Sequence, residues 1–518
     1  MPTLYRNGSV LTPTPAAATA LLVDGGRIAW IGTAAAAPDL PDRDVVDLAG
    51  GLVAPAFVDA HVHTTDTGLA ITGLDLRTAR SLREALDLVE RAARASRGRP
   101  VLGGGWDETT WPEQRPPTSA ELDRASYGGL VYLARVDIHS AVASSSLRAA
   151  VPGLAGLAGD RGDGWVGEPD AHDAVRRAAL AAVTRGQRRD AQRAALRHAA
   201  GLGVASVHEM AGPTISGEAD LADLLALAAV EPLPEVVGYW GELHGIDTAR
   251  ELGATGAGGD LFCDGSFGSA TAALGEPYAD RAGDDRGWLR FDTEDVAAHI
   301  AACVAAGLQS GFHAIGDAAV DQVLAAAELV TARLGHPLCP GHRLEHAEYV
   351  RDPARLAASG LTASVQPCFD ALWGGRSGMY AERLGPDRAL ALNRFADLAA
   401  AGVPLAFGSD SPVTGIGPWA AVRAAVGHHD PAAAIPLEAA FAAHTRGGWL
   451  AAGRRDEGTL AVGAAATFAV WDVSGRPRHA SGLPDVAATP ADDPGPRCVT
   501  TVLRGRTLHA ADDATPRA

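Results

Sequence analysis

The sequence contains no lysine, so every basic side chain apart from histidine is an arginine. This absence excludes chemistry that needs an amine side chain, such as a Schiff base or a carbamylated lysine. Basic residues are also outnumbered, with 44 Lys+Arg against 62 Asp+Glu and a formal net charge of −18 at pH 7. Nucleic acids and anionic membranes attract basic surfaces. We therefore expect neither to be a partner of this protein.

Cysteine is scarce, and no two of the five cysteines have the CxxC spacing of a zinc ribbon. A disulfide framework is not indicated either, so a reducing compartment is the simpler interpretation. The first residues, MPTLYRNGSVLTPTP, lack the charged segment and apolar core of a signal peptide. No uninterrupted apolar run reaches the roughly 18 residues of a membrane span. We expect a cytoplasmic protein.

Apolar residues make up 47% of the 518 residues and charged residues 20%, enough to bury a sizeable core. Short apolar runs alternate with Ala-rich stretches, which is typical of βα units around a parallel sheet. Eight candidate strands stand in residues 51–63, 203–210, 233–240, 259–267, 308–317, 342–350, 361–369 and 403–413. They predict an α/β fold, a (β/α)8 TIM-type barrel, whose functional groups lie at the C-terminal ends of the strands.

Both ends of the chain are rich in β-type runs and turn residues. We predict a small β-sandwich domain built from both termini, residues 1–55 and 450–518, and a barrel over residues 56–449. A large insertion, residues 66–195, follows the first barrel strand and carries apolar runs of its own, so we expect a substructure rather than a loop. The sequence leaves the assembly state open, a homodimer included.

Titratable residues end several of the predicted strands. His61 and His63 are two positions apart in a strand, so they face the same side and can chelate one metal ion. His313, His346 and Asp410 end three later strands. Barrel closure would gather these side chains at one rim. Such a ligand set suits a divalent metal with an open position for water, Zn²⁺ first, with Fe²⁺ and Mn²⁺ as alternatives.

The motifs of this chain resemble the amidohydrolase superfamily, and within it the amidohydrolase-3 group of N-substituted formamide deformylase-like amide hydrolases. The segments that carry the resemblance are VAPAFVDAHVH, GGGWDETTW, ARVDIHS, GVASVHEM, CDGSFGSATAAL, HAIGDAAVD, LEHAEYV, SVQPCF and FGSDSPV. The resemblance implies a metal-dependent hydrolase that cleaves a non-peptide C–N bond, the amide of a small molecule, by attack of metal-activated water.

The resemblance also implies roles for individual residues. The metal ligands would be His61, His63, His313, His346 and Asp410. Asp410 would in addition carry a proton from water to the leaving nitrogen, and His346 would stabilise the oxyanion.

One position departs from the family pattern. Many members bridge two metals through a carbamylated lysine in a Lys-x-x-x-Asp-Gly-Ser motif, and the matching residue here is Asp260. Asp260 itself, Cys263 or Glu209 are candidates for the bridge. An aspartate is shorter than a carbamylated lysine and would not span the same gap without backbone movement. We therefore favour one metal held by three of the histidines and Asp410, with His346 free to hydrogen-bond substrate or water.

Substrate-binding candidates lie in the insertion and after the seventh strand. They are Trp106, Trp111, Arg135, His139, Gln366 and Trp373. The two tryptophans of the insertion are expected to form an apolar wall at the barrel mouth, or alternatively to be core residues of the insertion. Arg135 and His139 are candidates for a polar substrate group.

Two other functions stay open. The first is a cyclic amide hydrolase or an aminohydrolase (deaminase) acting at the same site. The second is a catalytically degenerate barrel that binds a small molecule without turnover. The missing lysine favours the degenerate barrel, whereas the complete set of four histidines and one aspartate argues against it.

Overall fold

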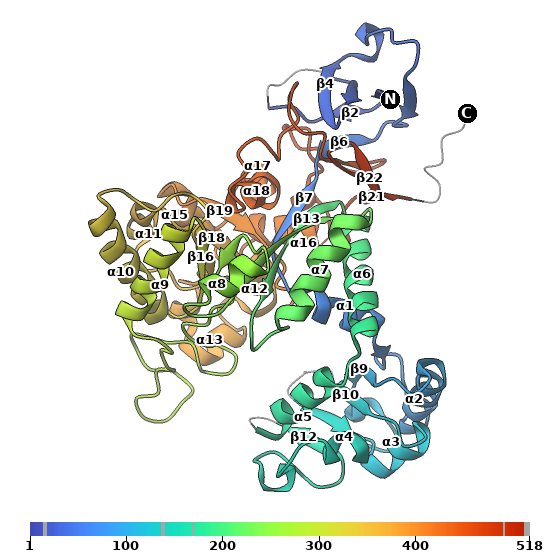
Figure 1. Ribbon diagram of the computed structural model, residues 1–518, viewed down its shortest axis with the longest axis vertical. Helices are drawn as coiled ribbons and strands as arrows, with labels where there is room; N and C mark the ends of the chain where they lie inside the picture. Colours follow the sequence, from blue (N-terminus) through green and yellow to red (C-terminus); the bar gives the residue numbers. More distant parts are fainter. Residues whose placement is uncertain (14–17, 136–139, 168–169, 491–492, 512–518) are drawn as a thin grey trace. The chain divides into compact units, whose positions relative to one another are not determined.

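The computed structural model describes residues 1–518 except 14–17, 136–139, 168–169, 491–492 and 512–518. The chain forms two compact units, one of Met1–Thr64 with Leu196–Ala518 and one of Thr65–Ala195. The larger unit holds an eight-stranded barrel sheet and two sheets built from the chain ends (Figure 1). Among the described residues, no helix has the length and apolar character needed to cross a membrane.

Eight parallel strands form the barrel, in the order β19-β18-β17-β16-β15-β14-β13-β7. They are β7 (Phe57–Val62), β13 (Val204–Ala211), β14 (Glu235–Trp240), β15 (Gly256–Ala257), β16 (Gln309–Ala314), β17 (Arg343–His346), β18 (Thr362–Val365) and β19 (Leu405–Phe407). Hydrogen bonds between the first strand and the segment after the last one close the sheet. The Asp410 amide donates to the His61 carbonyl at 2.8 Å, and the His63 amide donates to the Ser411 carbonyl at 2.9 Å. The predicted TIM-type barrel is confirmed.

Helices follow the strands along the chain, and apolar residues of several of them share one buried cluster with the barrel strands. They are α1 (Thr64–Thr72), α6 (Arg185–Gly201), α7 (Glu218–Val230), α8 (Ile246–Glu251), α9 (Thr293–Ala306), α10 (Asp317–Leu334), α11 (Pro353–Ser359), α12 (Pro367–Trp373), α13 (Met379–Leu384), α14 (Pro386–Ala389), α15 (Phe395–Ala400), α16 (Pro418–Val426), α17 (Leu437–Ala442) and α18 (Gly448–Ala451). Because helices cover the outside of the sheet, the strands are buried on both faces and read as nearly continuous apolar runs.

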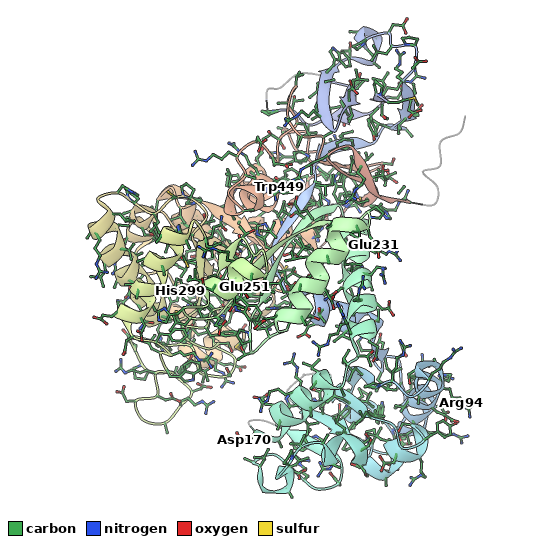
Figure 2. The ribbon with its side chains drawn as sticks, in the orientation of Figure 1. Arg94, Asp170, Glu231, Glu251, His299 and Trp449 are labelled. Atoms are coloured by element: carbon green, nitrogen blue, oxygen red, sulfur yellow. The ribbon has the colours of Figure 1, made fainter. Side chains whose placement is uncertain are left out.

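The fourth barrel strand differs from the prediction. The sequence predicts a strand over 259–267, but the strand is Gly256–Ala257 alone. It ends because Gly258 and Gly259 have φ of +152° and +88°, which side-chain-bearing residues rarely adopt. His299 of α9, labelled in Figure 2, donates from Nε2 to the last carbonyl of this strand at 3.0 Å. Beyond this bend the Leu-Phe-Cys run pairs with β16 again, through an isolated parallel bridge between Phe262 and His313. The Cys263 amide donates to the His313 carbonyl at 2.9 Å, and the His313 amide donates to the Leu261 carbonyl at 3.1 Å.

Two further sheets of the larger unit pack face to face. The first is ordered β4-β3-β1-β5 and the second β2-β6-β20-β21-β22. Their strands are β1 (Thr3–Arg6), β2 (Ser9–Val10), β3 (Ala20–Asp24), β4 (Arg27–Gly32), β5 (Asp44–Asp47), β6 (Leu52–Pro55), β20 (Phe468–Asp472), β21 (Arg497–Leu503) and β22 (Arg506–Ala510). Tyr5, Ile28, Phe468 and Val502 belong to the buried apolar cluster that they share. Strands from both chain ends thus build one β-sandwich.

The smaller unit has a sheet of its own, ordered β12-β11-β10-β9-β8. Its elements are β8 (Leu74–Asp75), α2 (Leu82–Ser96), β9 (Val101–Trp106), α3 (Ser119–Ala125), β10 (Val131–Arg135), β11 (Ser140–Ala143), α4 (Ser145–Ala149), β12 (Trp165–Gly167) and α5 (Asp170–Ala181). This unit follows the first barrel strand in the chain and has its own buried core.

Candidate metal centre

Six titratable side chains meet at the C-terminal end of the barrel. They come from the end of β7 (His61 and His63), the loop after β15 (Asp260), β16 (His313), the last residue of β17 (His346) and the segment after β19 (Asp410). They form two groups that share Asp260: His61, His63, Asp260 and Asp410, and Asp260, His313 and His346. Within each group one ligand atom per residue lies within 4.8 Å of the others. Barrel closure therefore gathers all the predicted ligands.

The Asp260 carboxylate lies between two pairs of imidazoles. Its Oδ2 is 3.4 Å from Nε2 of His61 and 3.1 Å from Nε2 of His63. Its Oδ1 is 3.5 Å from Nδ1 of His313 and 3.3 Å from Nε2 of His346. Only 4% of this residue is exposed, so it is part of the interior of the centre rather than a solvated loop acid.

Asp410 faces the first imidazole pair. Its Oδ1 is 3.4 Å from Nε2 of His61 and 3.1 Å from Nε2 of His63. Asp410 and His346 have φ of +53° and +67°, in the left-handed region that non-glycine residues rarely occupy. Such strained backbone persists where the surrounding structure holds it, often at functional sites. For Asp410, the amide hydrogen bond to His61 that closes the barrel provides this hold.

Each imidazole turns one nitrogen toward these carboxylates and has an acceptor at the other. The acceptor pairs are His61 Nδ1 to Glu345 Oε2 (2.9 Å), His63 Nδ1 to the Met210 carbonyl (3.0 Å), His313 Nε2 to the Gly265 carbonyl (3.1 Å) and His346 Nδ1 to Gln366 Oε1 (2.8 Å). A nitrogen facing such an acceptor carries a proton, so the nitrogen facing the centre is the one that can offer its lone pair to a cation. Acceptors of this kind fix the tautomer and orientation of metal-binding histidines.

Several buried polar atoms of the centre have no hydrogen-bond partner among the described residues. They are Nε2 of His61, Nδ1 of His313 and Oδ1 of Asp410. Burial opposes charge on His61, but the Asp260 and Asp410 carboxylates raise its pKa well above the usual range. The centre thus favours positive charge, and it holds buried nitrogen and oxygen atoms that could bind a cation and have no hydrogen-bond partner among the described residues. This donor set, of imidazole nitrogen and carboxylate oxygen, fits a divalent cation.

A buried ion pair that the sequence did not single out supports His61. Arg343 donates from Nε to Glu345 Oε1 at 2.6 Å and from Nη2 to Glu345 Oε2 at 3.0 Å. Burial alone would raise the pKa of Glu345, but Arg343 and His61 lower it to about 2. Arg343 Nη1 also lies 2.7 Å from Nδ1 of His208 on β13, and burial and this guanidinium keep the pKa of His208 well below its usual range. Charged residues at alternate positions of a buried strand are the signal that could have revealed the pair.

The other bridging candidates lie elsewhere. Cys263 is completely buried in the apolar core, and burial raises the pKa of its thiol well above the usual value. Glu209 accepts a hydrogen bond from the Thr64 amide at 2.8 Å, and burial raises its pKa to about 7. Neither belongs to the two ligand groups.

The substrate-binding candidates belong to both units of the chain. In the smaller unit the Trp106 and Trp111 side chains are buried, and their indole N–H groups donate to the carbonyls of Leu133 and Ala79 at 2.9 Å. They are core residues of this unit, the alternative that the sequence left open. Arg135 donates to Asp107 and Glu108 of the same unit, and His139 lies outside the described residues.

On the barrel, Gln366 is buried, and its Oε1 accepts the hydrogen bond from Nδ1 of His346 that is described above. Trp373 is half-buried. It belongs to a row of rings that starts at His346 and continues through Phe369, with ring centroids 6.2 Å and then 4.9 Å apart. Tyr380 follows at 6.2 Å from Trp373.

Residues 44–509 match the Amidohydrolase family. The chain belongs to this family. It is 29% identical over 459 residues to Protein LONG AFTER FAR-RED 3 of Arabidopsis thaliana, covering 82% of this chain and 77% of that protein. It is 35% identical over 159 residues to N-substituted formamide deformylase of Arthrobacter pascens, covering 29% and 28%. The solved structure of an uncharacterized metal-dependent hydrolase from Pyrococcus furiosus has 28% identity and a TM-score of 0.76, covering 91% of this chain and 98% of that one.

Proposed function

We propose that this amidohydrolase cleaves the amide C–N bond of a small non-peptide molecule with the help of a bound divalent metal, Zn²⁺ being the ion that the donor set suits best. The observation that carries the proposal is the convergence of four imidazoles and two carboxylates at the C-terminal end of the barrel, with buried donor atoms left unsatisfied. The relative named N-substituted formamide deformylase supports an amide as the bond attacked.

The metal would be held by the two groups around Asp260. When bound there, a divalent cation lowers the pKa of a coordinated water and polarises a carbonyl oxygen. The protein contributes fixed ligand orientations, because each imidazole is anchored at its second nitrogen.

Asp410 would move the proton. Its carboxylate faces the first pair of histidines and is anchored through its own amide, so one oxygen can accept a proton from the attacking water. Water then adds to the carbonyl carbon, the C–N bond breaks, and Asp410 returns the proton to the departing nitrogen. The products are a carboxylic acid and an amine.

The row of rings beside His346 favours a substrate with an apolar group. Phe369 and Tyr380 are buried in one apolar cluster, and the half-buried Trp373, which packs against this cluster, is the ring of the row that keeps exposed surface. We propose a linear or aryl-substituted amide, with an N-formyl or N-acyl group as the part that is cleaved.

Asp410→Asn tests the assignment of the proton carrier. We expect the variant to keep its metal and to lose activity toward N-formyl and N-acyl amines by about 100-fold or more, because general acid–base catalysis contributes on this scale. Amine release and metal content are measured on the same preparation. Asp247→Asn, which removes a carboxylate whose side chain is 93% exposed, is the matched control and should stay fully active. Near-wild-type turnover in Asp410→Asn contradicts the assignment.

A further inference from the structure

The residue at the fourth strand lacks the reach of a carbamylated lysine, and the backbone compensates for the difference. After β15 ends, Gly258 and Gly259 adopt positive φ, and the Leu261 amide bonds back to the Gly259 carbonyl at 2.8 Å. The chain turns sharply at this point. Asp260 is therefore the central residue of a tight turn rather than part of an extended strand.

Glycines allow this bend to lie against the neighbouring strand. A Cβ placed on Gly258 would be 2.1 Å from the amide nitrogen of Gly311 in β16, and a Cβ on Gly311 would be 2.5 Å from the amide nitrogen of Gly259. On the other side, a Cβ on Gly241 would be 2.9 Å from the Asp260 carbonyl oxygen. Backbone packs directly on backbone here. The loop can approach its neighbours more closely than side chains would allow.

The two carboxylate oxygens of Asp260 then serve different partners. Oδ2 faces His61 and His63, whereas Oδ1 faces His313 and His346, all at 3.1–3.5 Å. Unsatisfied buried nitrogens occur on both sides, Nε2 of His61 on one and Nδ1 of His313 on the other. A single ion on one side would leave the other side unsatisfied.

We propose that Asp260 is a ligand shared by two cation sites, one completed by His61, His63 and Asp410 and the other by His313 and His346. This inference rests on the proposed metal-dependent function and reverses the expectation of one metal. The Asp260 carboxylate is part of the side chain itself. The centre therefore assembles without carbon dioxide or bicarbonate, which the carbamylation of a lysine would require.

The test counts bound zinc in the full-length protein. The protein is stripped with a chelator, reloaded with Zn²⁺ in buffer freed of carbon dioxide, and analysed for zinc per chain. We expect two ions per chain, unchanged when bicarbonate is added. Asp260→Asn should hold one ion or fewer. The matched controls Cys263→Ser and Glu209→Gln, which alter the other bridging candidates, should still hold two.

Two further measurements keep the inference testable if Asp260→Asn folds poorly. Gly258→Ala keeps the carboxylate but places a methyl group against Gly311, and it should lose zinc as Asp260→Asn does. Wild-type protein loaded with Mn²⁺ should show the electron paramagnetic resonance spectrum of two spin-coupled ions.

Several results would overturn the inference: one zinc per chain in the wild type, a requirement for bicarbonate, two zinc ions retained in Asp260→Asn, or uncoupled manganese. These outcomes are separate from the hydrolase proposal. A protein that holds two ions and cleaves no amide would refute the proposed function and keep the shared ligand. A protein that cleaves amides with one ion would do the reverse.

Discussion

Glu345 and Arg343 show how residues outside the ligand set support the centre. Glu345 accepts from His61 Nδ1, and its carboxylate is held by two hydrogen bonds from Arg343. Neither side chain has any exposed surface. A buried charge is costly unless it is paired, so each member depends on the other. Glu345 is therefore a positioning residue that fixes which nitrogen of His61 faces the metal.

Glu345→Gln should weaken metal binding about 10- to 100-fold, the usual effect of removing such a support. The amide keeps the shape but leaves Arg343 without a counter-charge, so we also expect a loss of stability of about 3 kcal/mol or more. Metal dissociation constants are measured by competition with a chelator. Ser364→Ala removes one hydrogen bond from Arg343 without touching Glu345 and should bind metal normally. Equal affinities in wild type and Glu345→Gln would rule out the positioning role.

At this scale the sequence located the candidate ligands but not what holds them. His61, His63, His313, His346 and Asp410 could be named because each lies at the end of an apolar run. The supports could not be named, because a backbone carbonyl such as that of Met210 leaves no mark in a sequence. The part played by the carboxylate after the fourth strand depends on two backbone angles, which the sequence does not reveal.

Among the elements, the fourth strand is where the sequence prediction departs most from the structure. The run Leu261–Cys263 does pair with β16, but only through an isolated bridge at Phe262, because the preceding glycines bend the chain before it. The other seven runs overlap the observed strands because they are buried on both faces and bounded by turn residues. In the smaller unit, too, the sequence left a choice open. It could not decide whether Trp106 and Trp111 form an apolar wall at the barrel mouth or belong to the core of the insertion.

A buried histidine, His342, contacts the N-terminal end of β16 from the residue before β17, and its burial favours the neutral form. His342 is 5% exposed, and its Nδ1 accepts a hydrogen bond from the Ser310 amide at 3.0 Å. Burial lowers its pKa to about 4 from the ordinary value of 6.5. The unfolded chain therefore binds more protons than the folded one between pH 4 and 6.5, and stability falls as the pH drops through this window.

We expect the titration of this histidine to lower the free energy of unfolding by about 2 kcal/mol when the pH falls from 7 to 5. His342→Gln removes the titrating group, so the difference in unfolding free energy between the variant and the wild type should move by that amount in favour of the variant. Urea unfolding at the two pH values measures it, and other titrating groups cancel in the comparison. A difference that is the same at both pH values would show that His342 does not titrate as described.

The whole molecule owes its centre to barrel closure. His61 and Asp410 are far apart in the sequence, yet the hydrogen bonds between the first strand and the segment after the last one place them side by side. The barrel could be predicted because eight buried runs alternate with helical stretches, and the β-sandwich because β-rich runs stand at both chain ends. The substrate could not be predicted, since one fold hosts many reactions.

Removal and return of the metal test the central claim most directly. The full-length protein is stripped with a chelator, and amine release from a panel of N-formyl and N-acyl amines is followed before stripping, after stripping and after reloading with Zn²⁺ or Mn²⁺. The account predicts hydrolysis that disappears in the stripped protein and returns with the ion. Amide hydrolysis that persists undiminished without metal, or a fully loaded protein that releases no amine from any member of the panel, would contradict it.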